Sequence, residues 1–462
     1  MRQAICDPCF VDRSRPQPRV VIIGAGIAGL TAADRLSKCG LENIVVCEAI
    51  NRPGGRIHSC WIRESVAELG AEWIHGGNNS NPIFTMATTE GLLTPPLSYN
   101  KKSRYPLYLT SEGRALETPV ARVTSRVFRN MKKKAEMMFS LEKDRTESLM
   151  DYMSRELEAE VKAIREENRE DVERGLWGLI NSIKCRMGAE LTDISANLYG
   201  SFIKIPGESV IVPSGFIGVL GPAMKSISPK TIKFCKPVRM VVWGEGCNRA
   251  LVRCCDGEDI QADYVVVTVS LGVLKSTPDF FQPPLPQEKQ DAIDKVGIST
   301  VEEVHGGCGT LLRVTVAGRE ALETELLSEQ ELAKDMTMLL RRFTGDATLP
   351  WPVGIIRSKW TESPYFRGSN SYLGAGARVE DQCQLGCPVP GPRHPAAPII
   401  LFAGEATCPG HFGSAQGAYF SGIREADRIL KLTHHWGGPP PPLYPECDPC
   451  AYIPPKDPCI LS

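Results

Sequence analysis

The sequence predicts an α/β fold, and three observations carry that prediction. A short apolar run at residues 19–23 leads through closely spaced glycines into a helical pattern. A second apolar run, ENIVVCEA, follows at the distance expected for a unit of strand, helix and strand. Near the other end of the chain, the apolar segment PIILFAGEAT at 398–407 precedes an amphipathic pattern at 417–432. Such alternation is typical of a parallel sheet with helices on its faces.

The first unit contains a glycine pattern that is typical of dinucleotide binding. Residues 27–39 carry apolar side chains at helical spacing directly after Gly24 and Gly26. Gly24 permits a tight turn, Gly26 lets the backbone approach a pyrophosphate, and Gly29 allows the helix to pack against the sheet. The exposed N–H groups and the positive end of the helix dipole would then hold the phosphates. The unit therefore predicts a Rossmann-like site.

An acidic residue completes this pattern. Glu48 closes the second apolar run, about 20 residues beyond the last glycine, where a carboxylate accepts hydrogen bonds from ribose hydroxyls. A carboxylate here also repels a 2′-phosphate, which disfavours NADP. An apolar unit with glycines for packing alone is the alternative, but the full context favours nucleotide binding.

Two further segments favour FAD over NAD. Arg52 and Arg56 flank a second glycine loop that includes Gly55, and two guanidinium groups are suited to hold a pyrophosphate. Gly404 and Glu405 end the apolar strand near the C-terminus, and the expected helix after them begins with small residues. The positive end of that helix would face a cofactor ring that becomes anionic on reduction. Nucleotide-contacting segments at both ends of the chain imply an extended cofactor.

Composition and charge argue against several classes of partner. The chain has 53 basic and 54 acidic residues, so no basic surface for nucleic acid or an anionic membrane is expected. No apolar run is long enough to span a bilayer, and the N-terminal stretch lacks the apolar segment of a secretory signal. The 17 cysteines are then expected as reduced thiols in a cytoplasmic protein.

The two ends of the chain, 1–17 and the proline-rich 435–462, are predicted to be tails. Each contains the tetrapeptide CDPC, and two such pairs could in principle bind zinc, but their spacing is unlike a zinc site, so no metal is expected. The cysteines concerned are Cys6, Cys9, Cys447 and Cys450. The chain ends in Cys459-Ile460-Leu461-Ser462, which fits a prenylation box and would supply a weak membrane tether. This ending is not the peroxisomal S-K-L type.

Seven segments, in order, resemble one protein family. They are VIIGAGIAGLTAADRL, RPGGRIHS, ELGAEWIHG, KPVRMV with DYVVVTVSLGVLK, PPLPQEKQDAIDKVG, RSKWTESPYFRGSNSY, and LFAGEAT with the helix after it. In these segments, which cover most of residues 18–432, the chain resembles the flavin-dependent amine oxidases. The GAEWIHG stretch is more similar to polyamine oxidases than to monoamine oxidases.

The resemblance implies a Rossmann-like FAD-binding domain built from discontinuous segments, and an α+β substrate-binding domain. The first would comprise residues 18–80, 207–275 and 390–434, and the second, which is shortened, 81–206 and 276–389. Apolar residues at i, i+4 and i+7 within 118–185 fit the helical part of the second domain. With the motifs above, the resemblance leads us to expect non-covalent FAD in contact with Gly24, Gly26, Gly29, Glu48, Arg52, Gly55, Arg56, Val238, Thr268, Gly404, Glu405 and Ala418.

The resemblance also implies a reaction and residues for it. The family removes a hydride from the carbon beside an amine, and the imine hydrolyses to an aldehyde and a shorter amine, while oxygen yields hydrogen peroxide. We therefore expect oxidation of spermine, spermidine or their N-acetyl forms. His75 stands where the family has a histidine that hydrogen-bonds the amine, a role that suits a neutral imidazole. Trp360 stands at the tryptophan beside the flavin, and Trp73 and Phe412 are the other expected substrate contacts.

The substrate half departs from the family pattern. The family has a lysine, bridged by water to the flavin, on the strand after the Lys-Val-Gly turn, whereas VEEVHGGCGTLL contains none and Lys295 precedes the turn. The span after Gly297 is short, as though strands were missing, which would expose sheet edges and apolar helix faces. Asn370 stands where relatives have an aromatic, and Cys408 replaces a histidine.

Three interpretations stay open. The chain is a working polyamine oxidase, or it binds FAD but is an impaired paralogue or truncated isoform that lacks the flavin-bridging lysine. The third interpretation is an oxidase of another amine, such as a monoamine.

Overall fold

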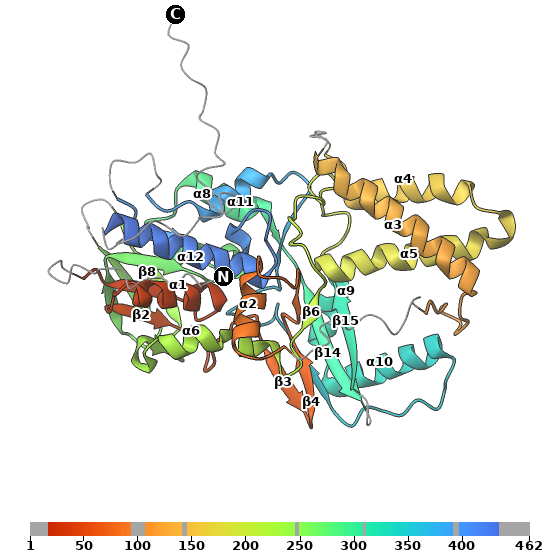
Figure 1. The fold of residues 1–462 in the computed structure, drawn as a ribbon, viewed down its shortest axis with the longest axis horizontal. Helices are drawn as coiled ribbons and strands as arrows, with labels where there is room; N and C mark the ends of the chain where they lie inside the picture. The colour runs from red at the N-terminus through yellow and green to blue at the C-terminus, as the bar shows by residue number, and fades with distance from the viewer. Residues whose placement is uncertain are drawn as a thin grey trace, which may run out of the picture.

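The computed structural model describes residues 17–93, 107–140, 146–244, 249–307, 311–390 and 397–433. Both CDPC sequences and Cys459 lie outside the described residues. Figure 1 shows a part rich in sheet that includes α1 (Ile27–Lys38) and α12 (Ala415–Leu432). Beside it lie three long helices, which are α3 (Thr118–Ser140), α4 (Leu149–Lys162) and α5 (Glu166–Met187).

A parallel sheet of five strands forms the centre of the first part. Its order is β18-β11-β1-β2-β7, and each neighbouring pair is parallel. The strands are β1 Val20–Ile23, β2 Ile44–Cys47, β7 Ile232–Lys233, β11 Tyr264–Val267 and β18 Ile400–Phe402. The predicted unit of strand, helix and strand is confirmed as β1, α1 and β2. Segments from both ends of the sequence therefore share one sheet.

Helices α1 and α12 cover one face of this sheet, together with α6 (Gly221–Ser226). Alternate residues of β1 point to opposite faces, so Ile22 packs under the helices and Ile23 packs in a second core. Helices α1 and α12 approach each other closely because Gly422 of α12 has no side chain. A Cβ on Gly422 would lie 2.3 Å from the backbone oxygen of Ala28.

A second sheet covers the opposite face, with the order β10-β9-β8-β12. Its strands are β8 Val238–Val242, β9 Ala250–Cys254, β10 Asp259–Ala262 and β12 Phe281–Gln282, and the helices beside it are α7 Leu271–Ser276, α8 Gln287–Lys295 and α11 Val379–Gly386. Phe281, Ile293 and Leu385 share one core with Ile23 of the parallel sheet. Segments that the sequence assigns to the substrate half therefore pack with the nucleotide-binding half.

The three long helices have a core of their own, which includes Met131, Leu157 and Ile180. The helical pattern predicted at 118–185 is confirmed. Helix α4 begins at the N-cap Ser148, whose side chain accepts a hydrogen bond from the backbone N–H of Asp151. Helix α5 ends at Gly188, whose φ of +70° favours glycine.

A small antiparallel sheet with the order β15-β14-β16 completes the substrate half. Its strands are β14 Val301–Gly307, β15 Leu311–Ala317 and β16 Ile355–Arg357, and the helices beside it are α9 Arg319–Leu326 and α10 Glu329–Thr344. Leu326 is 86% exposed and Val353 is 70% exposed, and Met338 on α10 is also exposed. The structure therefore has exposed apolar side chains in the region where the sequence predicts them.

The remaining elements are short. They are β3 Ser59–Ile62, β4 Ser65–Glu68, β5 Trp73–Ile74, β6 Val210–Ile211, β13 Val296–Ile298, β17 Ser371–Leu373 and α2 Pro82–Thr89, with 3₁₀ turns at 216–220, 229–231, 278–280 and 405–407. Within the described ranges, no helix combines the length and the apolar character needed to cross a membrane.

Candidate active site

A cavity of about 1520 Å³ runs between the parallel sheet and the substrate half. Its walls come from the turn after β1, the loop at 54–57, the GAEWIHG stretch, helices α3 and α5, strands β14 and β15, and the segment 404–418. A pocket for a drug-sized molecule has roughly 300–1,000 Å³. The cavity therefore has room for an extended dinucleotide and a smaller molecule beside it.

The glycine turn after β1 forms one end of the cavity. Gly24 has a φ of +110°, and a Cβ on Gly29 would lie 2.0 Å from the backbone oxygen of Gly24, so both positions require glycine for the turn and the packing. A Cβ on Gly26 meets no protein atom within 4 Å, and the same holds for Gly404. Both glycines line the cavity, so the space beside them is available to a bound group. This geometry fits FAD, whose pyrophosphate needs close approach to the backbone.

Glu48 lies at the same end and lines the cavity. One of its carboxylate oxygens accepts a hydrogen bond from the backbone N–H of Ala25 at 2.6 Å, and the other from that of Ile50 at 3.0 Å. Burial raises the pKa of Glu48, and these two hydrogen bonds oppose the rise. The carboxylate therefore fixes the glycine turn, besides any contact it makes with a ribose.

The two arginines of the second glycine loop do not act alike, contrary to the sequence expectation. Arg52 is not among the residues that line the cavity, and its Nη1 donates to the backbone oxygens of Pro53 and Ile57 at 3.2 and 3.3 Å. Arg56 does line the cavity, but its Nη1 donates to the carboxylate of Glu405 at 2.8 Å and to the backbone oxygen of Ser369 at 2.6 Å. Both guanidinium groups are thus engaged with protein, and of the two arginines only Arg56 lines the cavity.

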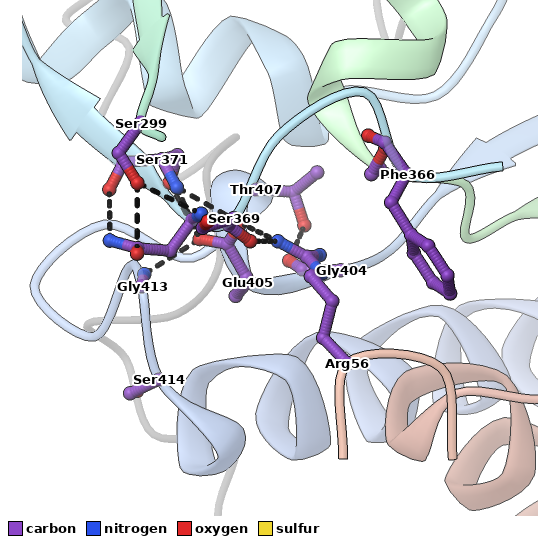
Figure 2. A network of polar contacts seen from close by, with 12 residues as sticks. Arg56, Ser299, Phe366, Ser369, Ser371, Gly404, Glu405, Thr407, Gly413 and Ser414 are labelled. Carbon is purple, nitrogen blue, oxygen red and sulfur yellow. Dashed lines mark hydrogen bonds and ion pairs between the residues drawn. The ribbon is translucent and has the colours of Figure 1, made fainter. Parts of the chain in front are cut away.

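Glu405 is the centre of a polar network, as Figure 2 shows. Its Oε2 accepts hydrogen bonds from the hydroxyl of Ser371 and the N–H of Gly413, each at 2.6 Å. Its Oε1 receives the ion pair from Arg56. The network joins three segments that are far apart in the sequence, and Ser369 and Ser371 carry no sequence signal that would reveal this role. Glu405 lines the cavity, but its carboxylate serves mainly to hold these segments together.

The other expected cofactor contacts, apart from Gly29 and Arg52, also line the cavity. They are Gly55, Val238, Thr268 and Ala418. Gly29 lies behind the turn, because its role is the close packing of α1 on β1.

The expected substrate residues gather at the other end of the cavity. Trp73, His75, Trp360 and Phe412 all line it. The indole N–H of Trp360 donates to the backbone oxygen of Leu69 at 2.8 Å. The ring also makes an edge-to-face contact with Phe366, with 4.9 Å between the ring centroids, and both contacts fix its position. The structure thus places four of the expected substrate contacts, three of them aromatic hydrocarbon or indole rings, in one cavity.

The imidazole of His75 is open to this cavity. Its Nδ1 lies 3.0 Å from the hydroxyl of Ser209. Burial lowers the pKa of His75 below its usual value, and the nearby charge of Arg186 lowers it further. The ring is therefore neutral near pH 7, with Nε2 available to a ligand.

The strand after the Lys-Val-Gly turn is β14, and it presents an acid to the cavity. Glu303 accepts hydrogen bonds at 2.8 Å from Nε of Arg313 and from the hydroxyl of Thr315. Burial raises the pKa of Glu303 to about 7, and the bond from Thr315 opposes that rise. Lys295 lies outside the cavity, and its Nζ is 3.7 Å from Oδ1 of Asp381. No lysine of β14 or β15 lines the cavity, and reasoning from motifs did not identify Glu303.

Both of the smaller departures from the family pattern can be placed. Asn370 lines the cavity, and its side-chain oxygen accepts a hydrogen bond from the hydroxyl of Ser299 at 2.9 Å. Cys408 is fully buried and does not line the cavity.

The parallel sheet, the glycine turn at its edge and the long cavity define a dinucleotide-binding oxidoreductase of Rossmann type. Residues 27–308 and 299–430 match the family described as flavin containing amine oxidoreductase. The chain belongs to this family and is an FAD-dependent amine oxidase.

Named relatives agree with this assignment. The chain is 31% identical to the peroxisomal N(1)-acetyl-spermine/spermidine oxidase of Bos taurus, over 90% of this chain and 95% of the relative. It is 30% identical to the protein of the same name from Homo sapiens, with the same coverage. The bovine alignment has 502 positions, more than the 462 residues of this chain, so the relative has residues without a counterpart here.

A solved structure is similar in fold. A putrescine oxidase bound to putrescine matches with a TM-score of 0.68 and 19% identity, over 90% of this chain and 99% of that chain. This likeness shows that the α/β arrangement is the one found in that oxidase.

Proposed function

We propose that the chain oxidises polyamines, namely spermine, spermidine or their N-acetyl forms, to an aldehyde, a shorter amine and hydrogen peroxide. One observation carries the proposal. The dinucleotide-binding turn and the aromatic pocket around His75 open into the same cavity. The names of the bovine and human relatives supply the substrate class.

The residues of the pocket have distinct roles in this proposal. FAD, when bound, supplies the hydride acceptor. The neutral imidazole of His75 accepts a hydrogen bond from the substrate amine, which orients the carbon to be oxidised. Trp73, Trp360 and Phe412 exclude water and hold the alkyl chain against an apolar wall.

The experiment is an anaerobic titration of the purified holoprotein with spermine, spermidine and N-acetylspermine. The proposal expects loss of the visible flavin absorption with at least one of these amines. An unchanged spectrum with every polyamine, in protein that contains FAD, would contradict it. Reduction by a monoamine such as benzylamine alone would assign another substrate.

A second candidate is the impaired oxidase, which one observation favours. The charged side chain of β14 that lines the cavity is Glu303, and β14 has no lysine, whereas the resemblance leads us to expect a lysine on this strand. Mixing the reduced protein with oxygenated buffer separates the two candidates. A working oxidase regains its flavin absorption rapidly, whereas the impaired form is reduced by the amine but stays reduced in air.

Other assignments stay proposals. We propose that the FAD-binding unit extends beyond residue 275 to about 296, and begins again near 379, because these segments pack in the core beneath the parallel sheet. The proposed partners are the amine and oxygen, without nucleic acid. The cytoplasmic location and the lipid at Cys459 rest on the sequence alone.

A further inference from the structure

One part of the cavity lining, contributed by the substrate half, is basic. Helix α3 contributes Lys132 and Glu136, helix α5 contributes Arg186, and the loop before β6 contributes Lys204. The carboxylate of Glu136 lies 3.6 Å from the ammonium of Lys132 and 2.7 Å from that of Lys204. One carboxylate is thus shared by two ammonium groups, and the guanidinium of Arg186 adds a third positive charge. We call these four residues the basic wall.

Arg186 is an exposed residue of α5 that lines the cavity, and it has no ion pair among the described residues. Burial is the largest cause of the altered pKa of His75, Lys132 and Tyr199, and the charge of Arg186 acts downward on the pKa of each. An unpaired guanidinium and the imidazole expected to hold the amine therefore line the same cavity.

Arg313 also lines the cavity, but it is paired with two acids. It forms an ion pair with Glu303 at 2.8 Å and a second with Glu72. The basic wall, by contrast, has three cations and the single carboxylate of Glu136.

This arrangement distinguishes amines by the charge at their distal end. The distal ammonium of a polyamine has the same sign as the basic wall and is repelled by it. A carboxylate, in contrast, matches the planar fork of a guanidinium with two parallel hydrogen bonds.

We propose that the basic wall is a carboxylate-binding subsite, so that the preferred amine of this enzyme carries a carboxylate at the end remote from the carbon that is oxidised. The inference rests on the proposed amine oxidation and names its substrate class. Arg186 is the specificity-determining residue, and Lys132 and Lys204 contribute charge.

The test uses a matched pair of probes. Spermidine and N-(4-aminobutyl)-3-aminopropanoate have the same backbone, except that a carboxylate replaces one terminal aminomethyl group. Binding to the holoprotein is measured by calorimetry and flavin reduction by anaerobic spectroscopy. We expect the carboxylate to bind about tenfold more tightly than spermidine, as a charge-assisted hydrogen bond provides.

Variants assign the preference to its residue. Arg186→Gln should remove the tenfold preference, whereas Lys133→Gln should retain it, because Lys133 is an exposed residue of α3 that does not line the cavity. Tighter binding of spermidine by the unmodified chain, or an unchanged preference in Arg186→Gln, would overturn the inference. Calorimetry measures the binding preference even if no amine reduces the flavin. Absence of flavin reduction would contradict the proposed oxidation but would leave the test of the carboxylate-binding subsite intact.

Discussion

At the scale of single residues, two glycines of the turn after β1 have different roles because they occupy different positions. Gly26 and Gly29 belong to one motif, yet one faces the cavity and the other faces the backbone of Gly24. The first can therefore affect binding without affecting the fold, and the second acts on the fold itself. This difference separates cofactor binding from stability by experiment.

We expect Gly26→Ala and Gly29→Ala to have opposite phenotypes. Gly26 has φ −70° and ψ 174°, which alanine adopts readily, so the free energy of unfolding should change by less than about 1 kcal/mol while FAD binds at least about tenfold more weakly. Gly29→Ala should lose about 1–3 kcal/mol or more from overpacking. Urea denaturation and FAD titration measure the two quantities. Equal FAD affinity of Gly26→Ala and the unmodified chain would place the pyrophosphate elsewhere.

The Glu48→Ala variant should retain FAD poorly. It leaves the N–H of Ala25 without its partner and removes a carboxylate from the ribose end, and a hydrogen bond to a charged group is worth about 1.5–3 kcal/mol. FAD affinity should fall about tenfold or more, as measured by flavin released on dialysis. Glu48→Gln, which keeps one acceptor, serves as the control and should lose less. Equal occupancy in all three proteins would show that this assignment is wrong.

His75→Ala should slow flavin reduction while FAD stays bound, since the imidazole lies on the substrate side. Burial, with the charge of Arg186, holds the pKa of His75 below its ordinary value, so the ring stays neutral to lower pH than a free histidine does, and its protonation then weakens amine binding. The acidic limb of the rate against pH should therefore lie below the usual range of a histidine and disappear in the variant. Release of the flavin by His75→Ala would mean that the residue is misplaced.

At the scale of elements, distant segments are held together by buried charge. Arg56 follows the second glycine loop, and Glu405 follows β18. The ion pair between these side chains links the glycine loop directly to the segment after β18. Figure 2 shows that Ser371 and Gly413 satisfy the remaining carboxylate positions. Because the carboxylate is buried, its partners must all be present for the segments to keep their places.

Arg56→Gln should destabilise the fold. It leaves the carboxylate of Glu405, which is 5% exposed, without its cation, and breaking such a buried pair costs about 3–5 kcal/mol. The exposed pair of Lys38 with Asp34 offers a matched control, since Lys38→Gln should cost less than about 1 kcal/mol. Urea denaturation of the apoprotein compares them. Similar losses in both variants would contradict the central position of Glu405.

At the scale of the whole molecule, one cavity joins the dinucleotide-binding turn to the expected substrate residues. The parallel sheet joins β1 with β11 and β18, which come from much later in the chain. The small sheet of β14, β15 and β16 carries exposed apolar residues beside it. The chain therefore combines a dinucleotide-binding turn with a cavity whose substrate side carries charged as well as aromatic residues.

The sequence predicts the nucleotide end well because local rules govern it. Strand, turn and helix follow from apolar spacing and from glycines, and each element around Gly24 lies where those rules place it. The sequence does not reveal Glu303 or Arg186, because their approach to the cavity depends on how β14 and α5 pack, which no local pattern encodes. It also assigns Arg52 to the pyrophosphate, although backbone oxygens nearby already bind that guanidinium.

The most direct measurement is the FAD content of the purified full-length protein, released by heat denaturation and compared with the protein concentration. The account predicts a yellow protein with close to one FAD per chain, all of it released because no covalent bond holds it. A colourless protein that stays colourless after incubation with FAD would contradict the claim that these distant segments form one flavin site.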